Sequence, residues 1–274
     1  MKFTIFTPTY NRAHLLPRLF RSLLQLDFQD FEWLIVDDGS TDETKNIVSE
    51  FQTCNSLNIR YFYQKNQGKH AAINLGVAQA KGEFFFIVDS DDWLPANSLS
   101  NSLKYTDRFQ SSSIAGIAGK RSFINAHNNF PFHELISTPL EIKYKFKNSF
   151  DLAEIYKTDV LKKYPFPVFP GEKFVTESLV WFRIARKYQL LFFNETIYHC
   201  EYQPGGLTDN YRKLMENNPQ GSLLYLRELL QQSIPAEAKK SAARNFNSIA
   251  RMNGRSRVWI LYQLGIRNYL RIFL

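Results

Sequence analysis

A run of large apolar residues that ends abruptly in carboxylates constrains this chain more than any other stretch. Residues 84–88 read Phe-Phe-Phe-Ile-Val, and residues 89–92 read Asp-Ser-Asp-Asp. An apolar run without polar alternation is typical of a strand that is buried on both faces of a parallel sheet. Open α/β sheets bind ligands at the carboxyl edge of their strands. The sequence therefore predicts that these acids lie at a binding edge.

The acidic segment 89–92 has two interpretations, and the segment alone leaves both open. Neighbouring carboxylates repel one another and are best tolerated around a cation, and their hard oxygen atoms suit Mg²⁺ or Mn²⁺. Alternatively, Asp and Ser are frequent in turns and at helix caps, so the segment would be an acidic turn before the next helix. The surrounding chain has to distinguish a metal site from a turn.

Strands and helices alternate through the first third of the chain. Short apolar runs at residues 2–7, 31–36 and 59–63 precede the run that Glu83 opens, and helical patterns lie between them. Alternation of this kind predicts an α/β fold with a doubly wound, mostly parallel sheet flanked by helices. Pro8 lacks an N–H group, so we expect it to end the first strand.

Polar residues follow each of these strands. Tyr10 and Arg12 follow the first, two aspartates at residues 37–38 follow the second, and a Gly-Lys pair at residues 68–69 opens a helix after the third. A strand-end aspartate can accept hydrogen bonds from a nucleobase or a ribose, and the free N–H groups of a helix start can hold an anion. Each feature alone is explained equally well as a loop or surface residue. No Gly-x-Gly-x-x-Gly follows the first strand, which argues against a dinucleotide site.

The chain beyond residue 95 is less regular. The spacing of apolar residues predicts a strand at residues 114–120 and a short helix at residues 150–164. Three prolines among aromatic residues at 164–171 predict a stiff loop that walls an acceptor pocket. A glycine-containing loop at residues 203–208 is a candidate lid. The remaining predicted elements are strands at residues 190–193 and 196–201 and helices at residues 214–230 and 236–252.

A carboxylate stands at the start of an apolar helix predicted over residues 179–185. Thr176 is a good N-cap, which leaves Glu177 in the first turn, where the helix dipole stabilises a negative charge. The alternative interpretation is chemical. A carboxylate among aromatic residues is partly desolvated and can act as a general base.

The net charge of +8 is concentrated at the C-terminal end. Residues 239–274 contain eight Lys and Arg and no Asp or Glu, while the rest of the chain has 26 of each sign. The last stretch, residues 258–274, mixes aromatics, leucines and arginines, as helices in a membrane interface do. The alternative interpretation of this stretch is a helix that packs on the domain and points its arginines outward. We therefore expect the tail to meet an anionic surface, with the membrane as the favoured partner.

The composition excludes several other classes. No apolar run reaches the 18 residues of a membrane-spanning helix, and the first residues lack a signal-peptide pattern. Cys54 and Cys200 show no metal-ligand spacing and fit reduced thiols in a cytosolic protein. We expect a cytoplasmic protein, peripheral at the inner face of the cell membrane, with no nucleic acid partner.

Four motifs together resemble the family 2 glycosyltransferases of GT-A fold. They are Thr-Pro-Thr-Tyr-Asn-Arg at residues 7–12, Val-Asp-Asp-Gly-Ser-Thr-Asp at 36–42, Asn-Gln-Gly-Lys at 66–69, and the stretch 82–92 that ends in Asp-Ser-Asp-Asp. Their order and spacing are similar to those of the family over about the first 95 residues. A weaker likeness continues through residues 177–208.

The resemblance implies an inverting transferase that uses a nucleotide-diphosphate sugar, usually a UDP-sugar, and Mn²⁺ or Mg²⁺. It implies Asp91 as the metal ligand and Glu177, where the family usually has Asp, as the catalytic base. Gln203 stands where the family often has His, which puts a metal contact from that loop in doubt. The resemblance places the nucleotide sugar near Thr7, Pro8, Thr9, Tyr10, Arg12, Asp38, Gly68, Lys69, Asp89 and Ser90.

These inferences divide the chain into three parts. We expect residues 1–95 to bind the nucleotide sugar, residues 96–210 to bind the acceptor and supply the base, and residues 211–274 to form a basic helical extension that contacts the membrane. The acceptor would be a glycan or a lipid-linked saccharide of surface-polysaccharide synthesis. The alternatives are a catalytically silent nucleotide-sugar-binding or scaffold subunit of a membrane assembly, and a nucleotidyltransferase. A nucleotidyltransferase would usually have a Gly-rich loop near the first strand, and this sequence has none there.

Overall fold

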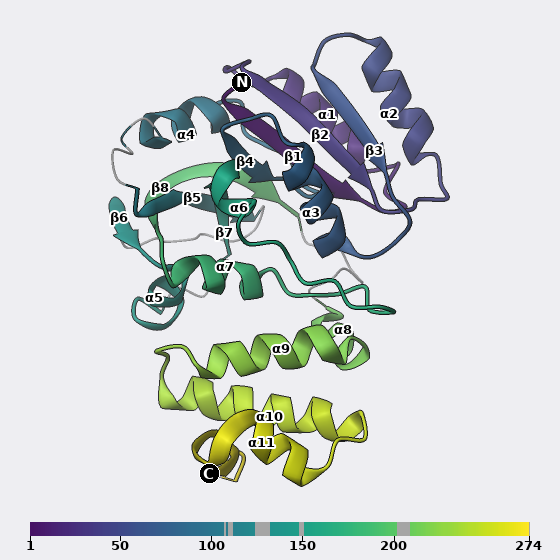
Figure 1. Cartoon of the computed structure of the whole chain (residues 1–274). Helices are drawn as coiled ribbons and strands as arrows, with labels where there is room; N and C mark the ends of the chain where they lie inside the picture. Colours follow the sequence, from purple (N-terminus) through teal and green to yellow (C-terminus); the bar gives the residue numbers. More distant parts are fainter. Residues whose placement is uncertain (107, 109–111, 124–131, 148–150, 202–208, 274) are drawn as a thin grey trace.

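The computed structural model describes residues 1–106, 108, 112–123, 132–147, 151–201 and 209–273. In this part of the chain, a mixed eight-stranded sheet is flanked by helices, and further helices form a layer at the C-terminal end (Figure 1). The expected α/β fold is therefore confirmed. The strands, in their order across the sheet, are β3 (Ile59–Tyr63), β2 (Phe31–Asp37), β1 (Phe3–Thr9), β4 (Phe84–Ile87), β7 (Leu152–Lys157), β5 (Ile114–Phe123), β8 (Gln189–Cys200) and β6 (Glu134–Ser137).

The first four strands are parallel, as the alternation predicted. β1 is central: it pairs with β2 on one side and with β4 on the other. The rest of the sheet is mixed, because β7 runs antiparallel to both β4 and β5, and β6 runs antiparallel to β8. The carboxyl ends of β1, β2 and β4 consequently meet at one edge, where the acids that follow them can converge.

The apolar runs are buried because helices cover both faces of the sheet. Phe84 and Phe86 belong to one core and Phe85 to the other, as successive side chains of a strand must. The first core lies under α1 (Leu16–Leu24), α2 (Thr44–Thr53) and α4 (Ser98–Thr106). The second lies under α3 (Lys69–Gln79) and α7 (Ser178–Ala185). Two short helices, α5 (Pro139–Tyr144) and α6 (Thr158–Leu161), complete this part.

Pro8 does not end the first strand, contrary to the sequence prediction. β1 continues to Thr9, with Pro8 opposite Val36 of β2. The Phe6 carbonyl accepts from Val88 N on the β4 side (2.8 Å), and residues two apart in a strand point the same way. The missing N–H group of Pro8 therefore faces the β4 side, where the β1–β4 ladder has already ended at Phe6 and Ile87. No ladder hydrogen bond is lost.

The predicted helix at residues 150–164 is wrong: residues 152–157 form the strand β7, and only the single turn α6 that follows is helical. Ala153 and Ile155 pack into one core while Tyr156 packs into the other. A strand buried on both faces has no polar alternation, so its apolar spacing can imitate a helix. Two smaller predictions also differ from the structure. The strands predicted at 190–193 and 196–201 are one bulged strand, β8. The N-cap of α7 is Glu177, and not Thr176 as predicted.

The C-terminal helices form a layer below the sheet in Figure 1: α8 (Tyr211–Asn217), α9 (Pro219–Leu230), α10 (Ala236–Met252) and α11 (Arg257–Leu270). The predicted helix at 214–230 is split at Asn218 because Pro219 starts a new helix. α9 and α10 join the same core as α7. α11 bends at Gly265, whose φ of 69° is non-helical. In the described residues, no helix is both long and apolar enough to cross a bilayer.

Candidate active site

A cleft of about 510 Å³ opens at the edge of the sheet where β1, β2 and β4 end. Most of the predicted donor-site residues line it, although they come from separate loops. Thr7 does not reach it, because its buried hydroxyl accepts from Trp33 Nε1 at 2.9 Å. The lining residues are Pro8, Thr9, Tyr10, Arg12, Asp38, Asn66, Gly68, Lys69, Asp89, Ser90, Asp91, Asp92, Arg121, Asp151, Lys173, Cys200 and Glu201.

The loop after β1 is fastened to the loop after β2. Asn11 adopts a positive φ of 52°, and its backbone N–H donates to Ser40 Oγ at 2.8 Å. The Asn11 side chain in turn accepts from the backbone N–H of Thr41 at 2.8 Å. This contact holds Tyr10, which is 47% exposed, and Arg12 at the cleft. An exposed aromatic ring at this edge is suited to stack on a nucleobase.

Asp38 organises the loop that precedes α3. Its carboxylate accepts from Gln64 Nε2 (2.7 Å) and from the backbone N–H groups of Gln67 (2.9 Å) and Gly68 (2.7 Å). Asp38 is almost fully buried, although it contributes to the cleft wall. Its visible role is therefore to shape the Gly-Lys turn, and a direct contact with a nucleotide stays a prediction.

Replacing Gly68 with Ala is expected to destabilise the fold. Gly68 has φ 95° and ψ 159°, a region that only glycine adopts readily, and strain there costs about 1–3 kcal/mol. A Cβ atom would also lie 1.9 Å from the Lys173 carbonyl oxygen. Gly171→Ala is the matched control, since Gly171 also has a positive φ but has nothing within 4 Å. Urea unfolding should show that Gly68→Ala lowers the free energy of unfolding more than Gly171→Ala does. Equal decreases would mean that the contact with Lys173 is easily relieved.

Lys69 joins two acids that are far apart in the sequence. Its Nζ lies 2.6 Å from Asp89 Oδ1 and 2.8 Å from Glu177 Oε1. Burial alone would lower the pKa of Lys69, but the charges of Asp89 and Glu177 raise it above its ordinary value. The same ion pair holds the pKa of Asp89 below its ordinary value against the effect of burial. Glu177, at the start of α7, is thereby held next to the cleft. The ammonium group of Lys69 lies between its carboxylate and that of Asp89.

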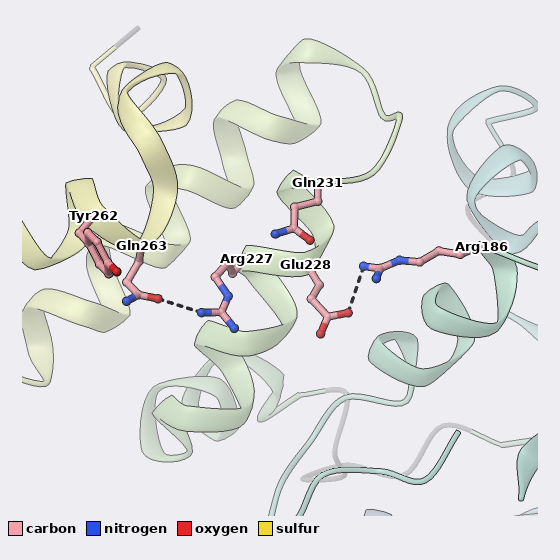
Figure 2. Close-up of a pocket in the computed structure, with 6 residues that line it drawn as sticks. All are labelled: Arg186, Arg227, Glu228, Gln231, Tyr262 and Gln263. Carbon is pink, nitrogen blue, oxygen red and sulfur yellow. Dashed lines mark hydrogen bonds and ion pairs between the residues drawn. The ribbon is translucent and has the colours of Figure 1, made fainter. Parts of the chain in front are cut away.

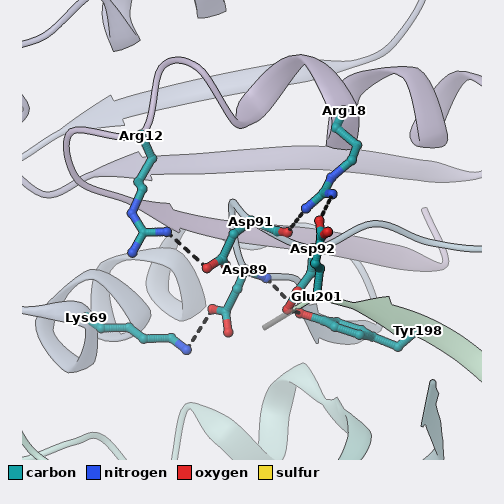
Figure 3. Close-up of polar contacts among 8 residues, drawn as sticks. All are labelled: Arg12, Arg18, Lys69, Asp89, Asp91, Asp92, Tyr198 and Glu201. Carbon is teal, nitrogen blue, oxygen red and sulfur yellow. Dashed lines mark hydrogen bonds and ion pairs between the residues drawn. The ribbon is translucent and has the colours of Figure 1, made fainter. Parts of the chain in front are cut away.

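Arginines surround the second acid of the motif (Figure 3). Arg12 Nη1 lies 3.0 Å from Asp91 Oδ2, and Arg18 donates to the Asp91 carbonyl and to Glu201 Oε2. The Arg18 guanidinium also stacks 4.2 Å from the centre of the Trp93 ring. The backbone and one carboxylate oxygen of Asp91 are thus held in place, while Oδ1 makes no hydrogen bond or ion pair within the described residues.

The site fits a divalent cation only if a substrate completes the coordination. In the part of the chain that the structure describes, no three His, Cys, Asp or Glu side chains are grouped so that they could hold a metal by themselves. Mg²⁺, however, is commonly bound by one or two carboxylates together with substrate phosphates. Asp91, with one carboxylate oxygen available at the cleft, is a suitable protein ligand of that kind.

Several site residues were missed in the sequence analysis. Tyr198 of β8 donates to Asp92 Oδ2 at 2.6 Å and accepts from the backbone N–H of Asp89 at 3.0 Å (Figure 3). Burial and the neighbouring Asp89 raise the pKa of Asp92 to about 7. Arg121 of β5 lies 4.3 Å above the Tyr198 ring and lines the cleft. No motif marks these residues, because they reach the site through pairings of the second half of the sheet.

A partly buried glutamate, Glu154 of β7, lies near Arg121 and Glu177. Burial raises the pKa of Glu154 to about 7, an effect that Arg121 opposes and Glu177 reinforces. The folded chain therefore keeps this proton up to about pH 7, whereas the unfolded chain loses it near 4.5. The stability that the protonated form contributes is complete below that lower value and falls as the pH rises towards 7.

Glu154→Gln should remove this pH dependence. We expect the variant to match the parent near pH 5 and to exceed its free energy of unfolding by about 2–3 kcal/mol near pH 8. Urea unfolding at both pH values measures the difference, with the exposed Glu50→Gln as the control. A gain that is the same at both pH values would contradict the raised pKa.

Two residues of the cleft wall have buried oxygen atoms that could accept a hydrogen bond from a ligand. Within the described residues, Thr9 Oγ1 and Asn66 Oδ1 are buried and make no hydrogen bond. Buried polar groups are normally satisfied by protein or by a bound molecule. Their position beside Tyr10 and Asp38 favours a polar ligand at this end of the cleft.

Comparison with known proteins identifies the family. The sequence model of "Glycosyl transferase family 2" matches residues 4–158, which is more than half of the chain. The protein therefore belongs to glycosyl transferase family 2, as its motifs predicted.

Individual relatives match shorter segments. The poly(ribitol-phosphate) beta-N-acetylglucosaminyltransferase TarS of Staphylococcus aureus is 34% identical over 113 residues, which is 40% of this chain and 20% of TarS. A GalNAc(5)-diNAcBac-PP-undecaprenol beta-1,3-glucosyltransferase of Campylobacter jejuni is 39% identical over 101 residues, which is 36% of this chain and 32% of that protein. The matched segments thus span about a third or less of these relatives.

Solved structures share the fold over nearly the whole chain. TarS residues 1–349 in complex with UDP-GlcNAc have a TM-score of 0.68 at 22% identity, covering 99% of this chain and 78% of that one. A mannosyltransferase of Pyrobaculum calidifontis in complex with GDP-Man and Mn²⁺ has a TM-score of 0.60 at 18% identity, covering 92% and 74%. The likeness confirms the predicted GT-A architecture of a central sheet flanked by helices.

Proposed function

We propose that the protein transfers a sugar from a nucleotide-diphosphate sugar, most simply a UDP-sugar, to an acceptor hydroxyl with inversion at the anomeric carbon. The observation that carries the proposal is the bridge of Lys69 between Asp89 and Glu177 beside the cleft. It places a candidate base from α7 next to the acidic motif after β4. The UDP-GlcNAc complex of TarS, which shares the fold, supports the choice of donor.

The loops after β1 and β2 would bind the nucleotide. Tyr10 would stack on the base, and the buried oxygen atoms of Thr9 and Asn66 would accept its N–H or ribose O–H groups. Arg12 and Arg121, which line the same cleft, would oppose the negative charge of the diphosphate. A cation bound at Asp91 would supply further neutralisation of the leaving group.

Glu177 would act as the general base. It would take the proton of the acceptor hydroxyl while the oxygen forms its bond to the anomeric carbon and the bond from that carbon to the diphosphate oxygen breaks. The ion pair with Lys69 would orient one carboxylate oxygen and leave the other for the acceptor. Bond formation on the face opposite the leaving group inverts the configuration.

The acceptor would be a glycan or a lipid-linked saccharide, at the cytoplasmic face of a membrane that the basic C-terminal helices contact. The C. jejuni relative, whose name states an undecaprenol-linked substrate, supports this class. The surplus of positive charge after residue 239 supports the membrane location.

Incubation of the purified protein with a panel of nucleotide sugars and Mn²⁺ tests the proposal. We expect slow hydrolysis of one donor, with a product whose initial anomeric configuration, seen by NMR, is opposite to that of the donor. If UDP binds but no donor is hydrolysed or transferred with any acceptor, the protein is a silent nucleotide-sugar-binding subunit instead.

A further inference from the structure

An open polar notch of about 430 Å³ lies between α7, α9 and α11, away from the candidate active site (Figure 2). Arg186, at the end of α7, points into it from one side, and Arg227 of α9 points toward α11 from the other. The complete lining is Arg186, Arg227, Glu228, Gln231, Tyr262 and Gln263.

The notch carries an excess of positive charge. Its carboxylate, Glu228, pairs with Arg186 (3.1 Å) and with Arg183 next to the notch (2.6 Å). Arg227 donates to the neutral Gln263 Oε1 at 2.8 Å and has no ion-pair partner within the described residues. Three arginines thus face one glutamate, and the guanidinium of Arg227 is available to an anion. Guanidinium groups pair readily with phosphate oxygens.

An exposed apolar face of α11 adjoins the notch. Tyr262 belongs to both, since it lines the notch and is 84% exposed. Val258 and Leu261 lie beside Tyr262 at helical spacing, and further exposed apolar residues follow beyond the bend at Gly265. The apolar face includes one residue just past the end of α11, Phe273. Its members are Val258, Leu261, Tyr262, Ile266, Leu270 and Phe273, each at least 36% exposed.

The positive charge of the C-terminal region indicates which kind of partner this face binds. Residues 239–274 contain eight basic residues and no acidic one. A second copy of the chain would bring the same positive charge onto the face and would be repelled. An anionic bilayer offers both complements, because its headgroups attract the arginines and its interface accepts apolar and aromatic side chains.

We propose that α11 lies in the interface of an anionic membrane through this apolar face, and that the notch with Arg227 binds the phosphate of one lipid headgroup. The proposal deepens the membrane contact proposed above and rests on it. It is independent of donor binding, so a failure here and a failure of UDP binding are separate results.

Flotation with vesicles of phosphatidylcholine, with and without phosphatidylglycerol, is the test. The parent should float only with the anionic vesicles. Arg227→Gln should weaken that binding about fivefold, the effect of one basic residue near a charged surface. Ile266→Asp should weaken it about tenfold, since an apolar side chain no longer enters the interface.

Matched variants distinguish binding through the notch and the apolar face from general effects of charge and hydrophobicity. Arg21→Gln and Ile136→Asp change exposed residues outside the C-terminal helices and should leave vesicle binding unchanged. Thermal unfolding and UDP titration should be the same for all four variants. The proposal is overturned if the parent ignores phosphatidylglycerol, if Arg227→Gln and Arg21→Gln behave alike, or if soluble glycerol 3-phosphate competes fully with the vesicles.

Discussion

Replacing Glu177 with Gln is expected to lower kcat by roughly 10²–10⁴-fold, the usual contribution of a general base. Glutamine keeps the shape of the side chain but cannot take the acceptor proton. Lys69 keeps its contact with Asp89, so the donor site should stay formed and UDP affinity should be unchanged. Steady-state transfer rates and calorimetric titration of UDP give the two quantities separately.

The control for this variant is Glu50→Gln, a change of an exposed glutamate on α2 outside the cleft. Glu177→Asp should retain part of the activity, since it shortens the base without removing it. Transfer by Glu177→Gln at the parental rate would show that another group takes the proton.

Replacing Asp91 with Asn should reduce transfer by about 100-fold or more, because metal-ion stabilisation of a leaving group contributes several kcal/mol. Asn has nearly the same shape, but it lacks the charge that a cation and Arg12 both require. The activity that remains should no longer respond to Mn²⁺ or to a chelator. Rates measured across a Mn²⁺ titration check this.

Asp159→Asn, on the exposed turn α6, is the control for the loss of one carboxylate. An Asp91→Asn enzyme that keeps both its rate and its response to Mn²⁺ would move the metal site elsewhere. The carboxylate of Asp91 would then serve only as the ion-pair partner of Arg12.

The first half of the fold was predictable because local pattern and tertiary role agree there. β2 is a buried strand and β3 a half-buried strand at the sheet edge, both are parallel and each is followed by a helix, and their ends lie within a residue of the prediction. The second half was less predictable because β7 inserts antiparallel between β4 and β5, which no local pattern announces. Its apolar residues face two cores at once, so their spacing was mistaken for a helix.

The residues of the candidate site were also only partly predictable from the sequence. Residues in the loops that follow strands, such as Asp38 after β2 and Asp91 after β4, were located by their position in the sequence. Arg121 and Tyr198 were not, since each lies within a long strand and reaches the acids only through the pairing of β5 with β8. Gln203 and the predicted lid at 203–208 lie outside the described residues, so the lid stays a prediction.

Calorimetric titration of the parent protein with UDP in the presence of Mn²⁺ tests the central claim most directly. If the cleft at the ends of β1, β2 and β4 is a nucleotide-sugar site, UDP should bind at one site per chain, and chelation of the cation should weaken the binding. An absence of saturable binding by UDP, and by every other nucleoside diphosphate tried, would contradict it.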